Sequence, residues 1–400
     1  MPCRLPGRLS GLAALAVIGA AVIGDTPVCI RAGTHLPEVH LADIRLSAGN
    51  EPEIVIDFVE HGVVTNQVLP DQVGGTLGIS GLPPGTALNE VGEQEAQAVG
   101  QQLFGEFGGP RGVAGIFAGV DIRMPETIAP FAALEDMTTQ LLTGLDEMDG
   151  GVYAGNSILS PAGVLFYLTL LAWSFGLDSV PMPGSVDFNG AAFEDMFTNA
   201  VDTMYKDALA NPVVSDNGDI TVVAASGEAA ISSWVLGNVK NPDLAFFAPR
   251  FFESLITGDS GGLFLPNGDV VDVTGNPEDG WTLVSWAGQA IPQNPGLLTE
   301  LVVDVRNLIA PPQIAVNNFF EAALTANTAT VDTALQAGLQ SVGAAIAQFP
   351  GSVVTDTVDE LANLVNDLAA GETFGAAFGS TILGLTPQLA AEVSGVLGSL

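Results

Sequence analysis

The chain is short of positive charge, of histidine and of cysteine. Of its 400 residues, 10 are Lys or Arg, 45 are Asp or Glu and 3 are His, which gives a formal net charge of −35. So few basic residues leave no patch that could neutralise a nucleic-acid backbone, and an anionic membrane surface would repel the chain. Nucleic acid is therefore excluded as a partner, and membrane contact is expected only through the amino-terminal segment, if that segment is retained.

The chain also lacks the residues that usually bind metal ions and cofactors. Both cysteines, Cys3 and Cys29, lie near the amino end, so the body offers no disulfide framework and no thiolate ligand. His61 is the only histidine after residue 40, which excludes a histidine metal cluster in the body. No phosphate-cradling Gly-Lys-Ser/Thr loop or dinucleotide glycine fingerprint is present. We expect no metal and no cofactor.

The amino end has the pattern of an export signal at residues 1–33. Arg4 and Arg8 precede an uninterrupted run of small and aliphatic residues at 11–23. That run suits a signal peptide and is shorter than the ~20 residues needed to span a bilayer. The pattern predicts an exported protein, extracellular or in the cell envelope. No Ala-x-Ala cleavage site follows, so an uncleaved anchor stays open.

A short β-branched run at 54–59 ends abruptly in Glu60-His61-Gly62. Such a run predicts a buried strand, because it suits a pleated sheet and is too short for a typical helix. Open α/β sheets place their chemistry at the carboxyl ends of strands. His61 is therefore the first candidate functional residue.

Strand and helix patterns alternate along the next part of the chain. Strands are expected at 54–59, 113–118, 220–225, 270–273 and 281–286, and helices at 90–104, 125–134, 161–175, 189–210 and 228–239. Residues 63–86 and 141–155 are expected to be loops. This alternation predicts a three-layer α/β/α domain over residues 50–291 with a mainly parallel sheet.

The composition changes at about residue 294, and no Lys or Arg follows Arg306. Apolar residues recur at steps of three and four within 331–346 and again within 354–368, on either side of Pro350-Gly351. This spacing predicts two amphipathic helices that form a hairpin around that break. We therefore expect an all-α, Ala/Gly-rich region at 296–400, with no chemistry assigned to it.

Four stretches occur in order at the predicted junctions. They are Phe58-Val-Glu-His-Gly-Val-Val-Thr-Asn66, Leu88-Asn-Glu-Val-Gly-Glu-Gln-Glu-Ala96, the segment at 116–129 containing Arg123, and Leu145-Asp-Glu-Met-Asp-Gly-Gly at the start of the loop at 145–155. Together they resemble the motifs of the histidine phosphatase superfamily, in its phosphoglycerate-mutase-like branch. The resemblance covers roughly residues 50–290.

The resemblance implies a phosphohistidine mechanism. His61 matches the nucleophile, Arg123 a phosphate-binding arginine and Glu147 the proton donor. Two positions depart from the family pattern: Glu60 stands where the family has arginine, and Gly227 stands where it has a second histidine. Phosphoryl transfer needs cations facing the phosphate oxygens, so we expect weak or absent turnover.

Other roles stay open for the same residues. Arg123 could serve only as the ion-pair partner of Asp121, Glu126 or Glu60, and Glu147 could belong to a solvated acidic loop. The functional prediction is an exported phosphomonoester hydrolase with a degenerate site. The alternative is a non-catalytic binding or structural module of the cell envelope, whose carboxylates hold a cation or cationic group. The expected partner is a phosphorylated small molecule or an envelope protein.

Overall fold

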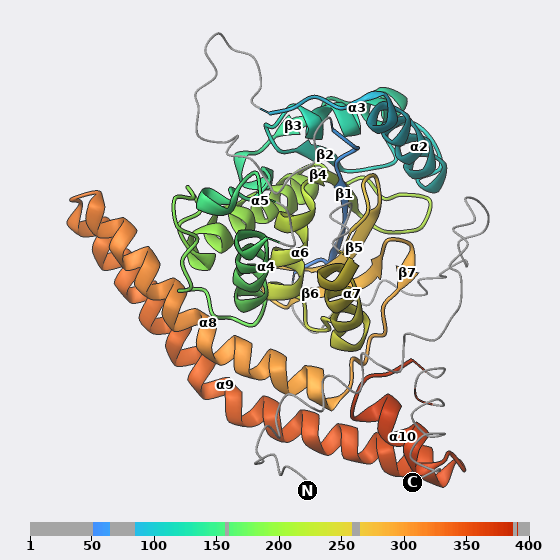
Figure 1. The fold of residues 1–400 in the computed structure, drawn as a ribbon, viewed down its shortest axis with the longest axis vertical. Helices are drawn as coiled ribbons and strands as arrows, with labels where there is room; N and C mark the ends of the chain where they lie inside the picture. Colours follow the sequence, from blue (N-terminus) through green and yellow to red (C-terminus); the bar gives the residue numbers. More distant parts are fainter. Residues whose placement is uncertain (1–50, 65–84, 157–159, 258–264, 387–389, 391–400) are drawn as a thin grey trace, which may run out of the picture.

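One seven-stranded sheet forms the centre of the molecule, in the order β3-β2-β4-β1-β5-β6-β7 (Figure 1). The computed structural model describes residues 51–64, 85–156, 160–257, 265–386 and 390. β1 (Ile54–Glu60) lies between β4 (Thr221–Ser226), to which it is parallel, and β5 (Val270–Asn276), to which it is antiparallel. The strand predicted at 54–59 is therefore confirmed, in the middle of the sheet.

The sheet is parallel in one half and antiparallel in the other. β2 (Gly115–Ala118) pairs in parallel with β4 and with β3 (Gln140–Leu141). β5, β6 (Gly280–Trp286) and β7 (Gln289–Ala290) form an antiparallel meander. Residues 277–279 are too few for the crossover that a parallel connection needs, so β5 and β6 form a hairpin. The predicted α/β architecture is confirmed, but the sheet is mixed and not mainly parallel, because three of its six strand pairings are antiparallel.

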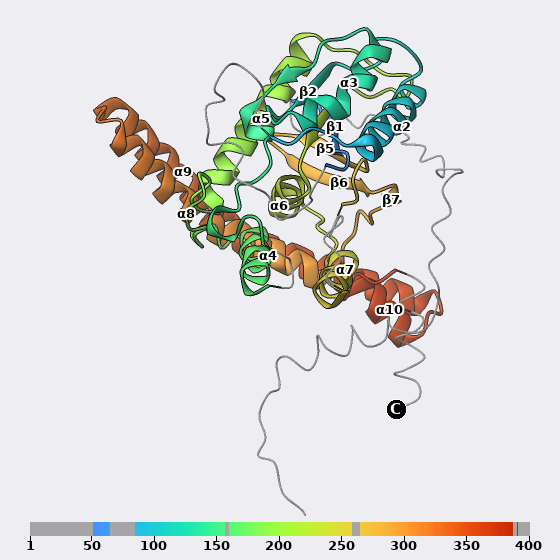
Figure 2. The same cartoon turned by 45° about the horizontal axis from the view of Figure 1, so that its top comes forward.

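Helices cover both faces of the sheet, as predicted. α2 (Glu90–Glu106) and α3 (Arg123–Glu135) cover one face, and the other carries α4 (Pro161–Ser174), α5 (Gly190–Ala210), α6 (Glu228–Asn238) and α7 (Leu244–Thr257) (Figures 1 and 2). Successive strand residues point to opposite faces, so Val59 packs in the α2–α3 core while Phe58 packs in the other. The sequence pattern missed α7, which contains Pro249.

The carboxyl-terminal hairpin exists, but its turn does not lie where the sequence pattern placed it. α8 (Leu297–Leu324) and α9 (Thr328–Ala369) are long helices, and α9 continues through Pro350. The chain reverses at 325–327, where Ala326 has a left-handed φ of 54° and the Asn327 side chain caps α9. The break predicted at Pro350-Gly351 is therefore wrong. We attribute this to α8, which packs along α9 and stabilises the helix on both sides of the proline.

The hairpin is fastened to the α/β body through α8. Arg306 is buried, and its two terminal nitrogens donate hydrogen bonds to the carbonyls of Leu236 (2.7 Å) and Val239 (2.9 Å) at the end of α6. Gln313 Nε2 donates to the Gly176 carbonyl at 2.6 Å. A short helix, α10 (Phe374–Thr381), follows α9. The division into domains at 291–296 stays a prediction.

Some predictions fall outside the described residues. The export signal at 1–33, most of the loop at 63–86 and the motif residue Asn66 all lie there. Within the described part of the chain, no helix is long and apolar enough to span a bilayer.

Candidate functional site

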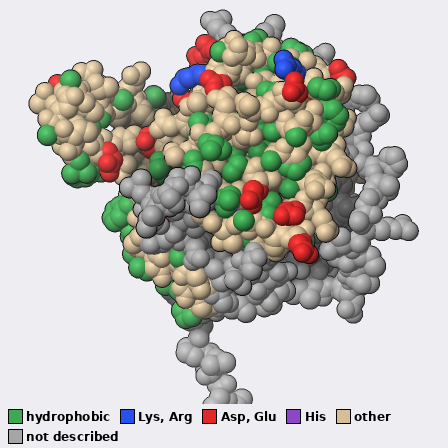
Figure 3. All heavy atoms as spheres, turned by 90° about the horizontal axis from the view of Figure 1, so that it is seen from above, with side chains coloured by type: hydrophobic (Ala, Val, Ile, Leu, Met, Phe, Trp, Pro, Cys, Tyr) green, Lys and Arg blue, Asp and Glu red, His purple; other side chains and the backbone are tan. Residues whose placement is uncertain are grey.

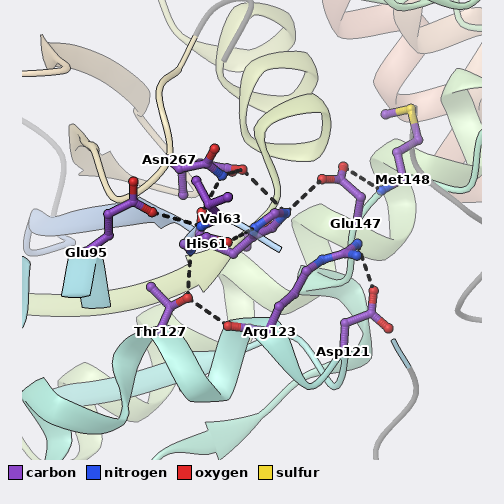
Figure 4. Close-up of polar contacts among 12 residues, drawn as sticks. His61, Val63, Glu95, Asp121, Arg123, Thr127, Glu147, Met148 and Asn267 are labelled. Carbon is purple, nitrogen blue, oxygen red and sulfur yellow. Dashed lines mark hydrogen bonds and ion pairs between the residues drawn. The ribbon is translucent and has the colours of Figure 1, made fainter. Parts of the chain in front are cut away.

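The candidate residues converge at the carboxyl ends of three neighbouring strands (Figure 4). Glu60 is the last residue of β1 and His61 follows it. Gly227 follows β4, and Arg123 is the first residue of α3, which follows β2. Glu147 enters from the segment after β3 and reaches within 4.0 Å of His61. The structure thus brings together all five predicted positions.

His61 is buried and held in one tautomer. Its Nδ1 lies 2.9 Å from the Gly62 carbonyl, which can only accept, so Nδ1 carries the proton and Nε2 keeps its lone pair. Nε2 lies 3.5 Å from Glu60 Oε1 and 4.0 Å from Glu147 Oε2. Burial, together with the positive charge of Arg123, lowers the His61 pKa to about 3. The ring is therefore a neutral base at physiological pH.

A tight backbone contact positions the loop that carries His61. The Gly62 N–H donates to Thr127 Oγ1 at 2.9 Å, and Thr127 Oγ1 donates to the Arg123 carbonyl at 2.7 Å. A Cβ at Gly62 would lie 2.7 Å from the Gly92 carbonyl oxygen, so the two glycines let this loop touch the first turn of α2. The glycines and threonine of the motifs therefore have structural roles.

Arg123 is already paired. Its Nη2 lies 3.2 Å from Asp121 Oδ2, and both side chains are buried. Of the three ion-pair partners considered, Asp121 is the one in contact. Arg123 Nε has no hydrogen-bond partner among the described residues, so this guanidinium keeps one donor for a further group.

Glu147 fills the space beside Gly227. A Cβ built at Gly227 would lie 1.8 Å from Glu147 Oε2. Glu147 Oε1 accepts from the Met148 N–H at 2.9 Å, and the carboxylate also interacts with the Ala230 amide in the first turn of α6. Helix amino termini favour anions. The carboxylate thus occupies an anion position where a side chain at 227 would project, and it does not belong to a solvated loop.

Glu60 is a buried carboxyl group whose pKa is strongly shifted. It is 3% exposed, and burial raises its pKa well above the usual range, with further contributions from Glu147 and Glu228. Asn267 Nδ2 lies 3.5 Å from Glu60 Oε1 and donates to the His61 carbonyl at 2.7 Å. Burial likewise raises the pKa of Glu147. Burial at the site therefore favours the protonated forms of Glu60 and Glu147.

The sequence analysis assigned no role to three residues of the site: Thr127, which lies within the motif segment at 116–129, Asn267 and Tyr167. Asn267 comes from the turn before β5, whose Pro-Asn-Gly sequence signals a turn but no role. Tyr167 lies in α4, where its apolar neighbours indicate only burial. Its pKa is raised well above the usual value by burial and by Glu228, Glu147 and Glu60. No sequence signal predicts the long-range contacts of Asn267 and Tyr167.

The site is rich in carboxyl groups and poor in cations. Arg123 is the cation placed among Glu60, Glu147, Asp121 and Glu228 in the described structure. No group of three His, Cys, Asp or Glu in the described residues is arranged to hold a metal ion. The available chemistry is a neutral imidazole, a paired guanidinium and carboxyl groups that can donate protons.

The fold and site define an α/β protein with a buried histidine at the carboxyl end of its central strand. No family model matches the chain. Among curated proteins, it matches a Mycobacterium tuberculosis protein named PE-PGRS family protein PE_PGRS11, with 41% identity over 314 residues, 78% of this chain and 49% of the relative. The chain thus spans about half the length of this curated relative.

Solved phosphatase structures are similar to part of the chain. A mycobacterial glucosyl-3-phosphoglycerate phosphatase is 16% identical, covers 59% of this chain and 100% of its own, and has a TM-score of 0.40. A phosphoserine phosphatase from Entamoeba histolytica is 17% identical, covers 58% of this chain and 96% of its own, and has a TM-score of 0.37.

Proposed function

We propose that this chain is a phosphatase-like protein whose pocket is closed to phosphate at neutral pH and serves binding in place of turnover. One observation carries the proposal. The Glu147 carboxylate occupies the space beside Gly227 where a second histidine would project, with its Oε2 1.8 Å from the position of a Cβ at 227.

Electrostatics support this proposal. The pKa values of Glu60 and Glu147 are raised, so the site disfavours ionisation of these two carboxyl groups. A phosphate dianion would add two more, facing a single guanidinium that is paired with Asp121. At ~4 Å and an effective dielectric of ~20, each unit of like charge costs about 4 kcal/mol before screening.

The same features favour a different ligand. Glu60, Glu147 and Glu228 can accept hydrogen bonds from an ammonium or guanidinium group, and ionising them beside a cation would relieve their mutual repulsion. An organic cation, such as a basic side chain of an envelope protein, therefore suits the pocket better than a phosphorylated small molecule. We also propose that the protein is exported by means of a signal at residues 1–33.

A second candidate function is phosphomonoester hydrolysis at acidic pH. His61 keeps its Nε2 lone pair down to a pKa of about 3, whereas the pKa values of Glu60 and Glu147 are raised. An acidic window thus exists in which the base is free and both carboxyl groups are protonated, so that Glu147 could protonate a leaving oxygen.

Turnover of an aryl phosphate across the pH range tests both candidates. The first predicts no turnover at neutral pH in the starting protein and some in Glu60→Arg/Gly227→His. This double variant restores two donors, and the Glu147 carboxylate lies at the end of a flexible side chain that can move aside. His61→Ala serves as the null variant, and the exposed Glu90→Gln controls for charge alone.

The two candidate functions predict different pH dependences of turnover. Turnover that rises as the pH falls and is lost in His61→Ala would support the acidic hydrolase. Turnover at neutral pH that depends on His61 would contradict the closed pocket.

A further inference from the structure

Five carboxyl groups meet where the first half of α8 packs against the second half of α9. They are Glu300 and Asp304 on α8 and Asp356, Asp359 and Glu360 on α9. The other four all act electrostatically on Glu300. Asp304 and Glu360 are buried, and Asn294 Nδ2 donates to Glu360 Oε1 at 2.7 Å from the α8 side. This acidic seam is therefore part of the contact between the two helices.

No basic side chain balances the acidic seam. None of its five carboxyl groups forms a salt bridge in the described part of the chain. Arg306, after which the sequence has no Lys or Arg, donates to carbonyls of α6. α10 has no ionisable side chain, and its Thr381 donates to Asp367 of α9 at 3.0 Å. Ionised seam carboxylates would therefore repel one another without compensation.

Buried oxygens of the seam also lack hydrogen-bond partners. Among the described residues, these are Glu300 Oε2, Asp304 Oδ2 and Glu360 Oε2. A buried carboxylate without partners is costly, whereas a protonated carboxyl group is neutral and can donate. The packed seam therefore suits carboxyl groups that hold protons.

One contact across the seam requires a proton. Asp356 and Asp304 form a hydrogen bond between their carboxyl groups, and two carboxylates can only accept. Burial raises the pKa of Asp356 to about 6, with a further contribution from Asp304, and burial raises the pKa of Glu300 to about 7. Because these values are raised on folding, the packed seam is stabilised in acid. That stabilisation is lost as the pH rises through them.

Pro350 divides α9 into two halves that contact α8 differently. Proline has no N–H, so the helix lacks one backbone hydrogen bond there, and a Cβ at the next residue, Gly351, would meet nothing within 4 Å. In the first half, a Cβ at Gly338 would lie 2.8 Å from the Ala315 Cβ of α8, and residues 333–355 contain no charged residue. The acidic seam lies entirely beyond the proline. Proline is a common point of helix bending, so the second half can move while the first stays packed.

We infer that Pro350-Gly351 is a hinge controlled by protonation of the acidic seam. While the seam carboxyl groups hold protons, residues 351–369 lie along α8. When these groups ionise, that half of α9 moves away and α10 moves with it, since Thr381 bonds it to Asp367. The hydrogen bond from the Leu298 N–H to the Ile382 carbonyl, 3.0 Å in the closed form, then breaks. None of these residues belongs to the site around His61, so the inference is independent of the proposed function.

Distances between spin labels on the two helices test the movement. In the full chain with Cys3→Ser and Cys29→Ser, one pair of labels is placed at Leu298→Cys and Val358→Cys, which are exposed beside the seam. This pair should give one short distance at about pH 5 and an additional longer one at about pH 8. A second pair, at the exposed Val316→Cys and Leu339→Cys before the hinge, should keep one distance at both pH values. A single short distance for the first pair at both pH values would overturn the inference.

Neutral side chains should hold the hinge closed. In Glu300→Gln/Asp356→Asn the first pair of labels should keep its short distance at about pH 8, because the amide at 356 donates to Asp304 without needing a proton. Asp332→Asn, exposed at the start of α9 and outside the seam, should leave the opening unchanged. Opening that persists in Glu300→Gln/Asp356→Asn would overturn the inference.

Tryptophan fluorescence separates hinge motion from unfolding of the α/β body. All four tryptophans of the chain lie in that body, at 173, 234, 281 and 286. Their emission maximum should therefore be the same with the hinge closed and open. Opening that occurs only together with a red shift of this emission would show general unfolding and contradict a hinge.

Discussion

At the scale of single residues, the lack of a side chain at Gly227 leaves the space that the Glu147 carboxylate occupies. The carboxylate lies where a side chain at 227 would project, and it interacts with amides at Met148 and Ala230. The sequence shows two departures from the family pattern, at Glu60 and Gly227. The structure adds that the Glu147 carboxylate lies in the space beside Gly227.

Removing this carboxylate should open the pocket to an anion. In Glu147→Ala, inorganic phosphate or vanadate is expected to raise the melting temperature, because the amino terminus of α6 and Arg123 then face a free space. The starting protein should show no shift. If neither protein responds to phosphate, Glu147 is not what excludes the anion.

The state of His61 is a separate prediction. Because its pKa is lowered to about 3, the imidazole should stay neutral throughout mildly acidic conditions. Its ¹⁵N chemical shifts should report a proton on Nδ1 and a lone pair on Nε2. An imidazolium signal near its ordinary pKa of ~6.5 would contradict this burial.

At the scale of elements, short-range patterns were predictable and long-range contacts were not. β1 and α2, with its Asn89 cap, are local patterns of apolar spacing and capping, and the structure has them. Whether Pro350 ends a helix depends on packing against α8, the preceding helix, and local spacing does not reveal that packing. Asn267 and Tyr167 reach the site only through the tertiary fold.

The seam between α8 and α9 should weaken as the pH rises. Burial raises the pKa of Glu300 to about 7, and repulsion from Glu360, Asp356 and Asp304 contributes to the shift. A carboxyl group whose pKa is raised on folding stabilises the fold at pH values below its unfolded-state pKa of ~4.3. That stabilisation is lost as the pH rises through its folded-state pKa.

Hydrogen exchange of the α8 and α9 amides tests this seam. Protection factors, which correct for the faster intrinsic exchange at higher pH, should be lower at about pH 8 than at about pH 5, and Glu300→Gln should reduce the difference. The exposed Glu278→Gln, remote from the seam, is the matched control. Equal protection at the two pH values would refute the role of these carboxyl groups.

At the scale of the whole molecule, charge of one sign dominates. Asp and Glu outnumber Lys and Arg on the face seen in Figure 3, in line with the net charge of −35. Burial and the neighbouring Asp272 raise the pKa of Asp57, which lies in β1 opposite Asp272 of β5. Repulsion among the exposed carboxylates and the cost of ionising the buried carboxyl groups therefore both disfavour the folded state as the pH rises.

The thermal stability of the full chain should reflect this excess. We expect a higher melting temperature at about pH 5 than at about pH 8, and an increase on adding salt at about pH 8. Asp57→Asn should raise the stability at about pH 8 by about 1 kcal/mol, since the amide needs no proton to be neutral. A melting temperature that rises with pH would contradict this picture.

The measurement that tests the closed pocket most directly is calorimetric titration of the full chain with inorganic phosphate at neutral pH, beside Glu60→Arg/Gly227→His. We predict no binding to the starting protein at millimolar phosphate and saturable binding to the double variant. Saturable binding to the starting protein that is lost in His61→Ala would show a phosphate site in working order and contradict the account.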